Sequence, residues 1–332
     1  MQQIQDRLEV VKNLEKDVEK SISDWLRPSE EIWQAFDFLP RMGQPGFEEQ
    51  IRALQKSSAQ ISDSLLLVLI GNMITEEALP SYETWFNQLD GMGGYGGVSL
   101  NPWARWMRGW TAEENKHGEI LLLYLYLTGR ADMNAVSRAI QGLISNGFDP
   151  QTGRDPYMGL VYTSFQERAT NISHHNTGRL AIKEGDALLG KICNIMAGDE
   201  ARHEKAYKTL FKRVLDVDPE NAVSAFAEMM RRKIVMPAKH MTDKEEKNLF
   251  IQHIVVAQKI GVYTAKDYAD VIRHLIEFWN IASIKNLNSE AAKDQDYLCG
   301  LAEFYDKKAS QLSVLARLRP KMKNSWLFGR SI

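Results

Sequence analysis

Apolar residues recur every three or four positions along most of this 332-residue chain, and polar residues fill the positions between them. Near the beginning of the chain the recurring apolar positions are Leu8, Val11, Leu14, Val18 and Ile22. This spacing is typical of amphipathic helices, because one helical turn takes 3.6 residues. No long segment alternates apolar and polar residues as a strand would. The pattern therefore predicts an all-α protein.

The periodic segments and the breakers between them give approximate bounds for the predicted helices. Proline and glycine gather at 33–46, 90–102 and 147–156, which are expected to be loops. Pro80 removes a backbone hydrogen bond to residue 76, so a kink is expected there. Helices are predicted at about 4–25, from 46 to beyond 54, from 63 to beyond 80, and at 103–127, 132–146, 157–184, 188–214, 221–233, 249–260 and 268–279.

Two of these helices carry the same pair of polar residues in an apolar setting. Glu114 and His117 lie three positions apart, just before the apolar run 120–127, and Glu200 and His203 repeat the spacing. No other histidine among the seven in the chain has a glutamate three positions earlier. Residues three apart share one face of a helix. An unpaired charge on a buried face costs several kcal/mol, and a bound metal ion would offset that cost.

Two Glu-x-x-His helices, each partnered by a single Glu on another helix, form the ligand plan of the di-iron four-helix bundles. Glu167 is one candidate for the single Glu, and either Glu76 or Glu77 is the other; periodicity does not decide between these two. We therefore predict a ferritin-like four-helix bundle core with a di-iron centre, elaborated by additional helices. The bundle core is expected at about 48–235 and the C-terminal helices at about 236–332, within one domain spanning 1–332.

Composition narrows the compartment and the partners. The net charge of −2 gives no general attraction to nucleic acid, and Cys193 and Cys299 form neither a disulfide framework nor a zinc site. The longest apolar runs, 65–70 and 120–127, are too short to cross a bilayer. The first residues resemble neither a signal peptide nor a transit peptide. We expect a soluble protein in a reducing compartment, either the bacterial cytoplasm or, for a mature plant-type chain, the plastid stroma.

The ligand types favour iron or manganese over structural zinc, because oxygen and nitrogen donors are present without thiolate. Four carboxylates carry four negative charges, which two ferrous ions would neutralise. Six side chains for two ions would leave coordination positions open for dioxygen.

Three neighbouring residues are candidates for supporting roles. Asp199 could accept a hydrogen bond from a ligand imidazole, most directly that of His117. Trp33 could lie beyond this pair and carry electrons inwards, although a core-filling aromatic is an equal alternative. Thr170, one turn after Glu167, could point its hydroxyl at bound oxygen. Its alternative is a hydrogen bond to the carbonyl four residues back.

The chain resembles the soluble acyl-carrier-protein desaturases of the plant stearoyl type over the region from about residue 20 to its end. In that family the first glutamate of the Thr-Glu-Glu-Ala motif is a ligand, which selects Glu76. The resemblance implies that two iron ions per subunit are held by Glu76, Glu114, His117, Glu167, Glu200 and His203. The matching segments are Trp33-Gln34 with 37–40, 73–80, 110–115 with His117-Gly118, 162–170, Asp199-Glu200 with 202–204, and 262–270.

The resemblance also implies an activity and partners. The expected reaction inserts a cis double bond, most often between carbons 9 and 10, into a saturated acyl chain on acyl carrier protein. Reduced ferredoxin supplies electrons, dioxygen is reduced to water, and the enzyme is a homodimer. The stretch 306–332 has seven basic residues against the single acid Asp306, which could steer an acidic partner. A solvated basic tail is the alternative interpretation.

The substrate channel is expected to end near Trp85 and Phe86, which lie nine and ten residues after Glu76. On a continuous helix this separation is about 14 Å. Plant enzymes that favour eighteen carbons usually have Met-Leu there, so we hypothesise that Trp85 shortens the channel and shifts preference towards sixteen carbons or fewer. The resemblance places further channel-lining positions at Leu89, Pro150, Thr152, Gly159 and Leu160.

Other interpretations stay open at this point. The chain could be another oxygen-activating di-iron oxygenase or hydroxylase on the same bundle. A ribonucleotide reductase radical subunit is disfavoured, because it usually has aspartate as its first ligand, where this chain has Glu76. A non-catalytic ferritin-like iron-binding protein is a further alternative, but storage chains are typically half this length.

Overall fold

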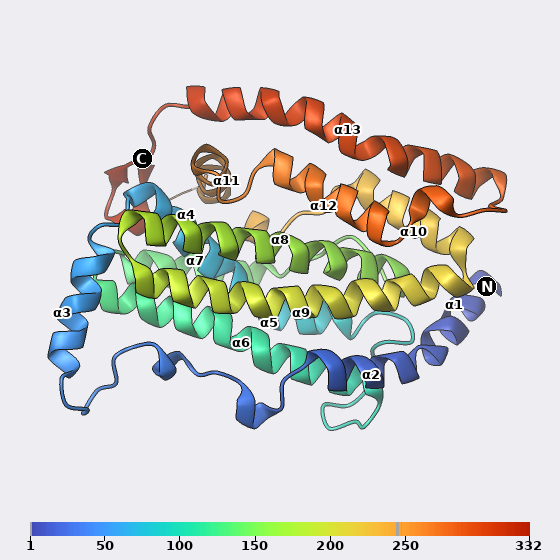
Figure 1. Cartoon of the computed structure of the whole chain (residues 1–332), viewed down its shortest axis with the longest axis horizontal. Coiled ribbons are helices and arrows are strands. Elements are labelled where there is room, and N and C mark those ends of the chain that lie inside the picture. The colour runs from blue at the N-terminus through green and yellow to red at the C-terminus, as the bar shows by residue number, and fades with distance from the viewer. Residues whose placement is uncertain (1, 244–245, 247) are drawn as a thin grey trace.

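The computed structural model describes residues 2–243, 246 and 248–332, and helices dominate this part of the chain. The predicted all-α class is confirmed. The described residues add one short antiparallel hairpin, in which β1 (Lys323–Asn324) pairs with β2 (Arg330–Ser331). Figure 1 shows long helices running side by side along the long axis, with α13 as an outer layer.

The bundle core is built from α4 (Asp63–Glu76), α6 (Pro102–Thr128), α8 (Pro156–Glu184) and α9 (Ala187–Val217). Helix α4 packs on α6 and α8, and α9 packs on α6 and α8, which closes the ring of four (Figure 1). Helices α8 and α9 approach closely at Gly190, which has no side chain. A methyl group at this position would overlap the side chain of Ile182. These four helices surround the interior in which the predicted ligands lie.

Side-chain caps begin each core helix, and such caps satisfy backbone N–H groups that lack an intrahelical partner. Ser62 accepts from the backbone of α4, Asn101 from α6, Asp155 from α8 and Asp186 from α9. Asp186 also accepts a 2.7 Å hydrogen bond from the hydroxyl of Tyr124, which ties the start of α9 to α6. Residues 65–75 of α4 are all buried, as expected of a helix that is apolar on every side.

The remaining elements cover the two sides of this core. Helix α2 packs on α6 and α9, whereas α10 and α12 pack on α8 and carry α13. The bounds are α1 Gln2–Asn13, α2 Glu15–Trp25, η1 Ser29–Glu31, η2 Ala35–Asp37, α3 Phe47–Ser58, α5 Leu79–Phe86, α7 Met133–Asn146, α10 Pro219–Arg232, η3 Pro237–His240, α11 Leu249–Ile260, α12 Ala265–Phe278, η4 Ile281–Ser283, α13 Ser289–Leu318 and η5 Ser325–Leu327.

The structure differs from the predicted helices in two places. The expected helix over 4–25 is divided at Leu14 into α1 and α2, although Val11 and Val18 are buried, as expected of its apolar face. The expected kink at Pro80 is a complete break. Helix α4 ends at Glu76 and α5 begins at Leu79, so Trp85 and Phe86 lie on a separate helix from Glu76.

The C-terminal stretch 306–332 is also more structured than a solvated tail. Its first part belongs to the 30-residue helix α13, and the buried side chains of Trp326 and Leu327 anchor the end against α4 and α7. Among the described residues, no single helix is long and apolar enough to cross a membrane. By length and composition alone, the bent pair 47–58 and 63–86 could do so.

Candidate metal centre

The six predicted ligands converge inside the four core helices. With His174, they form two overlapping sets. Within each set, the possible ligand atoms all lie within 4.8 Å of one another. Glu200 belongs to both sets. The first set is Glu76, His117, His174 and Glu200, and the second is Glu114, Glu167, Glu200 and His203.

Glu114 lies between the two predicted histidine ligands. One of its oxygens is 3.1 Å from Nδ1 of His117, and the other is 2.6 Å from Nδ1 of His203. Glu114 and Glu200 therefore occupy the middle of the cluster. Glu76 and Glu167 stand at its two ends, each next to one of the imidazoles.

The outward ring nitrogen of each histidine faces a second carboxylate. Nε2 of His117 is 3.5 Å from Asp199, the residue proposed for this place on sequence grounds, and Nε2 of His203 is 3.0 Å from Glu113. Trp33 donates a 2.7 Å hydrogen bond to Asp199 and stacks on the ring of His117 with an interplanar angle of 9°. These outer contacts fix the orientation of both imidazoles.

One guanidinium joins the two outer carboxylates. Nη2 of Arg202 donates to Oε2 of Glu113 at 2.5 Å and to Oδ1 of Asp199 at 2.6 Å. The second nitrogen, Nη1, donates to the backbone carbonyl of Trp25. Arg202 thus links the supports of both histidines to the helix that covers them.

Sequence reasoning missed three residues that contact the predicted ligands. Glu113 is the acid beside Glu114, and a pair of adjacent acids before an apolar run was the available signal. Trp110, one turn before Glu114, donates from Nε1 to Glu167 at 3.0 Å. His174, two turns after Glu167 on α8, also enters the cluster, and the spacing of seven residues places it on the same face.

The residues fit a pair of cations. Several buried oxygen and nitrogen atoms that could bind a metal ion point into the cluster. They have no hydrogen-bond partner of acceptable geometry among the described residues. Buried polar atoms are normally satisfied, so such a concentration indicates a missing partner of positive charge. The atoms are Oε1 of Glu114, Nδ1 of His117, Oε2 of Glu167, Oε1 of Glu200 and Nδ1 of His203.

The proton affinities of the cluster agree with this conclusion. Burial raises the pKa of Glu167 well above its ordinary value, and the charges of Glu114 and Glu200 raise it further. Burial would lower the pKa of His203, but the charge of Glu114 and its hydrogen bonds to carboxylates raise it well above the usual value. Without a metal ion to balance the negative charge of the acids, residues such as Glu167 and His203 therefore bind protons more tightly than usual.

Thr170 does not point a free hydroxyl into the cluster. Its Oγ1 donates to the carbonyl of Gln166 at 3.2 Å and to that of Glu167 at 3.1 Å. This is the intrahelical alternative described above for this residue. Thr170 nevertheless lines both cavities beside the cluster.

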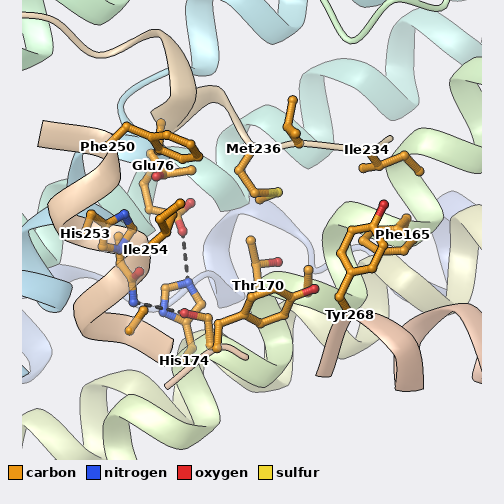
Figure 2. Close-up of a pocket in the computed structure, with 18 residues that line it drawn as sticks. Glu76, Phe165, Thr170, His174, Ile234, Met236, Phe250, His253, Ile254 and Tyr268 are labelled. Carbon is orange, nitrogen blue, oxygen red and sulfur yellow. Dashed lines mark hydrogen bonds and ion pairs between the residues drawn. The ribbon is translucent and has the colours of Figure 1, made fainter. Parts of the chain in front are cut away.

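A cavity of about 290 Å³ adjoins the cluster (Figure 2). Its walls are mostly apolar, as in Phe165 and Met236, and they run from the partly exposed Ile254 to Glu76. A second cavity, of about 10 Å³, shares Glu76 and Met236 with the first and continues to Tyr82. The two cavities together mark a path beside the candidate ligands; it is mostly apolar in the larger cavity, and Glu114 and Gln166 join the lining of the smaller one.

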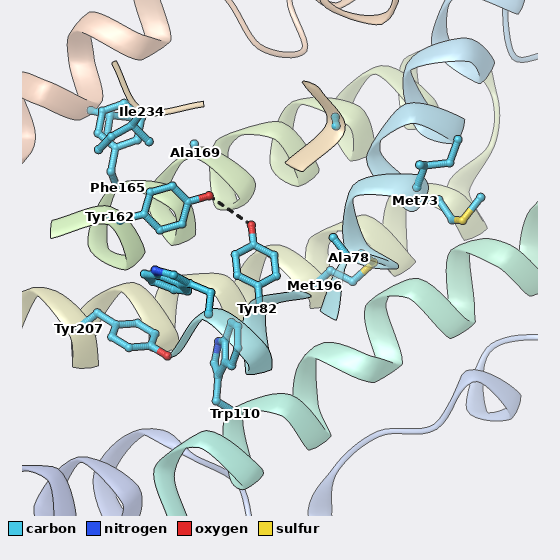
Figure 3. Close-up of a cluster of buried hydrophobic side chains, with 14 of the residues drawn as sticks. Met73, Ala78, Tyr82, Trp110, Tyr162, Phe165, Ala169, Met196, Tyr207 and Ile234 are labelled. Atoms are coloured by element: carbon cyan, nitrogen blue, oxygen red, sulfur yellow. Dashed lines mark hydrogen bonds between the residues drawn. The ribbon is translucent and has the colours of Figure 1, made fainter. Parts of the chain in front are cut away.

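An aromatic group closes this path. The hydroxyls of Tyr82 and Tyr162 point at one another 3.4 Å apart, and Trp110 lies edge-on to Tyr82 (Figure 3). The ring of Trp85 packs edge-on against both tyrosines and lines neither cavity.

The residues predicted to end a channel are close-packed in this region. Nε1 of Trp85 donates to Oγ1 of Thr152 at 2.7 Å, and a methyl group at Gly159 would lie 2.6 Å from Leu89. In the described part of the chain, none of the seven predicted channel residues lines either cavity. The other three, Phe86, Pro150 and Leu160, are buried as well.

Comparisons with known proteins agree with the fold and the ligand pattern. The family model described as fatty acid desaturase matches residues 6–328. The chain is 49% identical over 329 residues to stearoyl-[acyl-carrier-protein] 9-desaturase 1, chloroplastic, of Arabidopsis thaliana, covering 98% of this chain and 83% of that protein. It is 47% identical over 326 residues to acyl-[acyl-carrier-protein] desaturase, chloroplastic, of Cucumis sativus, covering 98% and 82%.

A solved structure shares the fold at much lower sequence identity. It is the X-ray structure of "putative acyl-ACP desaturase DesA2" from Mycobacterium tuberculosis H37Rv, with a TM-score of 0.58 and 19% identity. The match covers 86% of this chain and 99% of that one. The helical bundle is therefore common to both chains.

Proposed function

The chain belongs to the fatty acid desaturase family, and from that premise we propose that it is an acyl-[acyl-carrier-protein] desaturase of fatty acid biosynthesis. The proposed reaction removes two hydrogens from a saturated acyl chain to form a cis double bond, with carbons 9 and 10 as the expected position. Dioxygen takes two electrons and two protons from the chain, two electrons from reduced ferredoxin and two protons from solvent, and two molecules of water are formed.

One observation carries this proposal. The apolar path beside the cluster brings a narrow, water-poor space against Glu76 and Thr170. A saturated acyl chain has no polar group for recognition, so burial of apolar surface must hold it. A simple iron-binding bundle has no use for such a path.

The metal is proposed as two iron ions. The residues that would hold them are the six predicted ligands: Glu76, Glu114, His117, Glu167, Glu200 and His203. A bound iron pair would supply the activation of dioxygen, which no protein side chain provides. Manganese fits the same donor types.

The protein side chains have separable proposed roles. Phe165 and Met236 would hold the chain in the path and exclude water. Thr170 would present its methyl group and hydroxyl beside the reacting carbons, with the hydroxyl free to exchange its intrahelical hydrogen bond for one to a bound molecule. Trp33, hydrogen-bonded to Asp199, would carry electrons inwards along the contact with His117.

Trp85 is proposed to set the length of the acyl chain. Its indole is fixed by the hydrogen bond to Thr152 and packs edge-on against Tyr82, which lines the smaller cavity. The preference would therefore fall on chains of sixteen carbons or fewer. Trp85 and Thr152 would form the closed end of the path together with Phe86, Leu89, Pro150, Gly159 and Leu160.

The proposed partners are acidic proteins and a second copy of the chain. The basic side chains of 306–332 are exposed, among them Lys307, Lys308, Arg317 and Arg319, and they could steer acyl carrier protein or ferredoxin. We further propose a homodimer, one structural domain per chain, and an aqueous compartment, either the plastid stroma or a bacterial cytoplasm.

The first test is product analysis. The iron-loaded protein is incubated with dioxygen, reduced ferredoxin and a mixture of palmitoyl and stearoyl acyl carrier proteins, and the products are read by mass spectrometry. A mono-unsaturated acyl product is expected, and a Glu200→Gln variant should give none. Consumption of oxygen without an unsaturated product would contradict desaturation and favour another di-iron oxygenase on the same bundle.

A further inference from the structure

The two single glutamates at the ends of the cluster present their oxygens in the same way. Oε1 of Glu167 accepts the 3.0 Å hydrogen bond from Trp110, and its Oε2 faces Nδ1 of His203 at 3.7 Å. One oxygen is thus held by a ring N–H from another core helix, α6. The other is left for the interior of the cluster.

Glu76 has the matching arrangement at the opposite end. Its Oε1 lies 2.9 Å from Nε2 of His174, the contact drawn in Figure 2, and its Oε2 is 4.0 Å from Nδ1 of His117. His174 comes from α8 and Trp110 comes from α6, so each glutamate is held by a ring from a different core helix. Nε2 of His174 is also 3.6 Å from Glu200.

We propose that His174 is a positioning residue for the metal centre, which holds one oxygen of Glu76 so that the other is presented to a metal ion. The inference rests on the proposed metal site and adds a residue to it. His174 is not assigned as a ligand; its ring nitrogen acts through the carboxylate.

A purely structural role explains the contacts of His174 less well. The side chain is 1% exposed, and its second nitrogen, Nδ1, has no hydrogen-bond partner among the described residues. Among the described residues, the ring makes its polar contacts with two carboxylates of the cluster, Glu76 and Glu200. Most side-chain hydrogen bonds in proteins go to the backbone or to water, so contact with two candidate ligands favours a role in the cluster.

The backbone at Glu76 explains why a positioning contact is needed. Glu76 is the last residue of α4, directly before the break at 77–78, whereas the other candidate ligands lie within long continuous helices. A carboxylate at a helix end is less constrained by its own backbone. Second contacts of this kind typically change metal affinity by about 10–100-fold when they are removed.

The test is anaerobic titration of the metal-free protein with ferrous iron. His174→Leu should weaken binding of one of the two ions by at least about tenfold and leave the other largely unchanged. His174→Gln, which keeps an N–H donor, should recover most of the affinity. His175→Leu is the matched control, because His175 is the next residue on the same helix and is exposed; it should bind iron as the parent does.

A double-mutant comparison keeps the inference testable if His174→Leu is unstable. In a Glu76→Gln background, His174→Gln and wild-type His174 should bind the remaining ion alike, because the carboxylate to be positioned is gone. Equal affinity of His174→Leu and the parent overturns the inference. The inference is also overturned if the pulsed EPR spectrum of iron-loaded His174→Gln loses one histidine nitrogen signal, because that result would make His174 a ligand.

The outcome for the metal site itself is read separately. If the parent protein binds no iron, the proposed metal centre fails. If the parent binds two ions and His174→Leu binds them equally well, the centre stands and only the role of His174 is rejected.

Discussion

At the scale of single residues, the site is organised by pairs of hydrogen bonds rather than by the candidate ligands alone. Each predicted histidine ligand faces an acid of the cluster with one nitrogen and an outer carboxylate with the other. Arg202 then joins the two outer carboxylates through a single nitrogen. The orientation of both imidazoles therefore depends on one guanidinium.

Replacing Arg202 should weaken both metal positions together. Arg202→Gln removes the nearest guanidinium from the buried acids Glu113 and Asp199 and leaves Asp199 with the more distant guanidinium of Arg27, at 3.7 Å, so both acids would then rotate or take up protons. We expect ferrous iron affinity to fall by about 10–100-fold at both positions, measured by anaerobic titration. Arg168→Gln is the control, because Arg168 pairs with Glu204 instead. A loss confined to one ion would argue against the shared clamp.

Replacing Trp85 should change the chain-length profile. Trp85→Met removes the indole that packs against Tyr82, so the ratio of kcat/KM for stearoyl to palmitoyl carrier protein should rise by about tenfold or more. Thr152→Val is the matched control, because it removes the hydrogen bond to the indole and keeps the ring volume. Identical product profiles for Trp85→Met and the parent would reject a channel-ending role.

At the scale of elements, close helix contacts around α4 hold the site in place. The ring of His253, on α11, lies against Gly71 of α4, where a methyl group would be 2.5 Å from Cδ2 of the ring. Space for that ring exists because position 71 has no side chain. The wall of the larger cavity, which His253 lines, depends on the same contact.

Gly71→Ala should therefore destabilise the protein by about 1–3 kcal/mol through overpacking, measured by urea unfolding. Adding His253→Ala should recover part of the loss, since the ring that clashes is removed. Gly300→Ala in α13 is the control; nothing lies within 4 Å of a methyl group there. That control should be neutral or more stable by about 0.5–1 kcal/mol. Equal effects of the two alanines would contradict the packing argument.

The elements also show what the sequence could and could not predict. Helix α11 has the predicted bounds, 249–260, because apolar residues fill most of its positions and Gly261 follows it. Helix α13 was not predicted from periodicity, since its buried face includes the small side chains Ala302, Ala309 and Ala316 while Leu315 and Leu318 are exposed. Hydrophobic spacing favours large residues and misses a face built from alanine.

The candidate site was also predictable only in part from the sequence. The spacing of Glu114 with His117 and of Glu200 with His203 identified two helices and one face of each. The contacts of Glu113 and His174 depend on which helices become neighbours, and spacing within one helix does not contain that information. The break after Glu76 was expected only as a kink, because Pro80 alone does not determine how far the chain turns.

At the scale of the whole molecule, stability should depend on pH through His253, a buried histidine whose ring nitrogens have no hydrogen-bond partner among the described residues. Burial lowers the pKa of His253 to about 4 from 6.5. Between these values the unfolded chain binds more protons than the folded one, so the free energy of unfolding falls as the pH decreases from about 6.5 towards 4. The neutral ring is tolerated above this range.

The predicted loss attributable to His253 is about 2 kcal/mol at pH 5 relative to pH 7. His253→Phe removes the titrating group, so its urea midpoint should change less between these two pH values than that of the parent. His175→Phe, at an exposed position, serves as the control. An unchanged pH dependence in His253→Phe would show that other groups cause the acid sensitivity.

The break between α4 and α5 has an electrostatic consequence as well. A helix carries about half a negative elementary charge at its C-terminal end, because the last carbonyl groups lack partners. Helix α4 ends at Glu76, but α5 begins at Leu79, so the positive N-terminal end of α5 offsets much of this partial charge beside the cluster. The carbonyls of Met73 and Thr75 are also occupied by the backbone N–H groups of Glu77 and Ala78. The attraction for cations at this end of the site therefore comes from the carboxylates rather than from the helix ends.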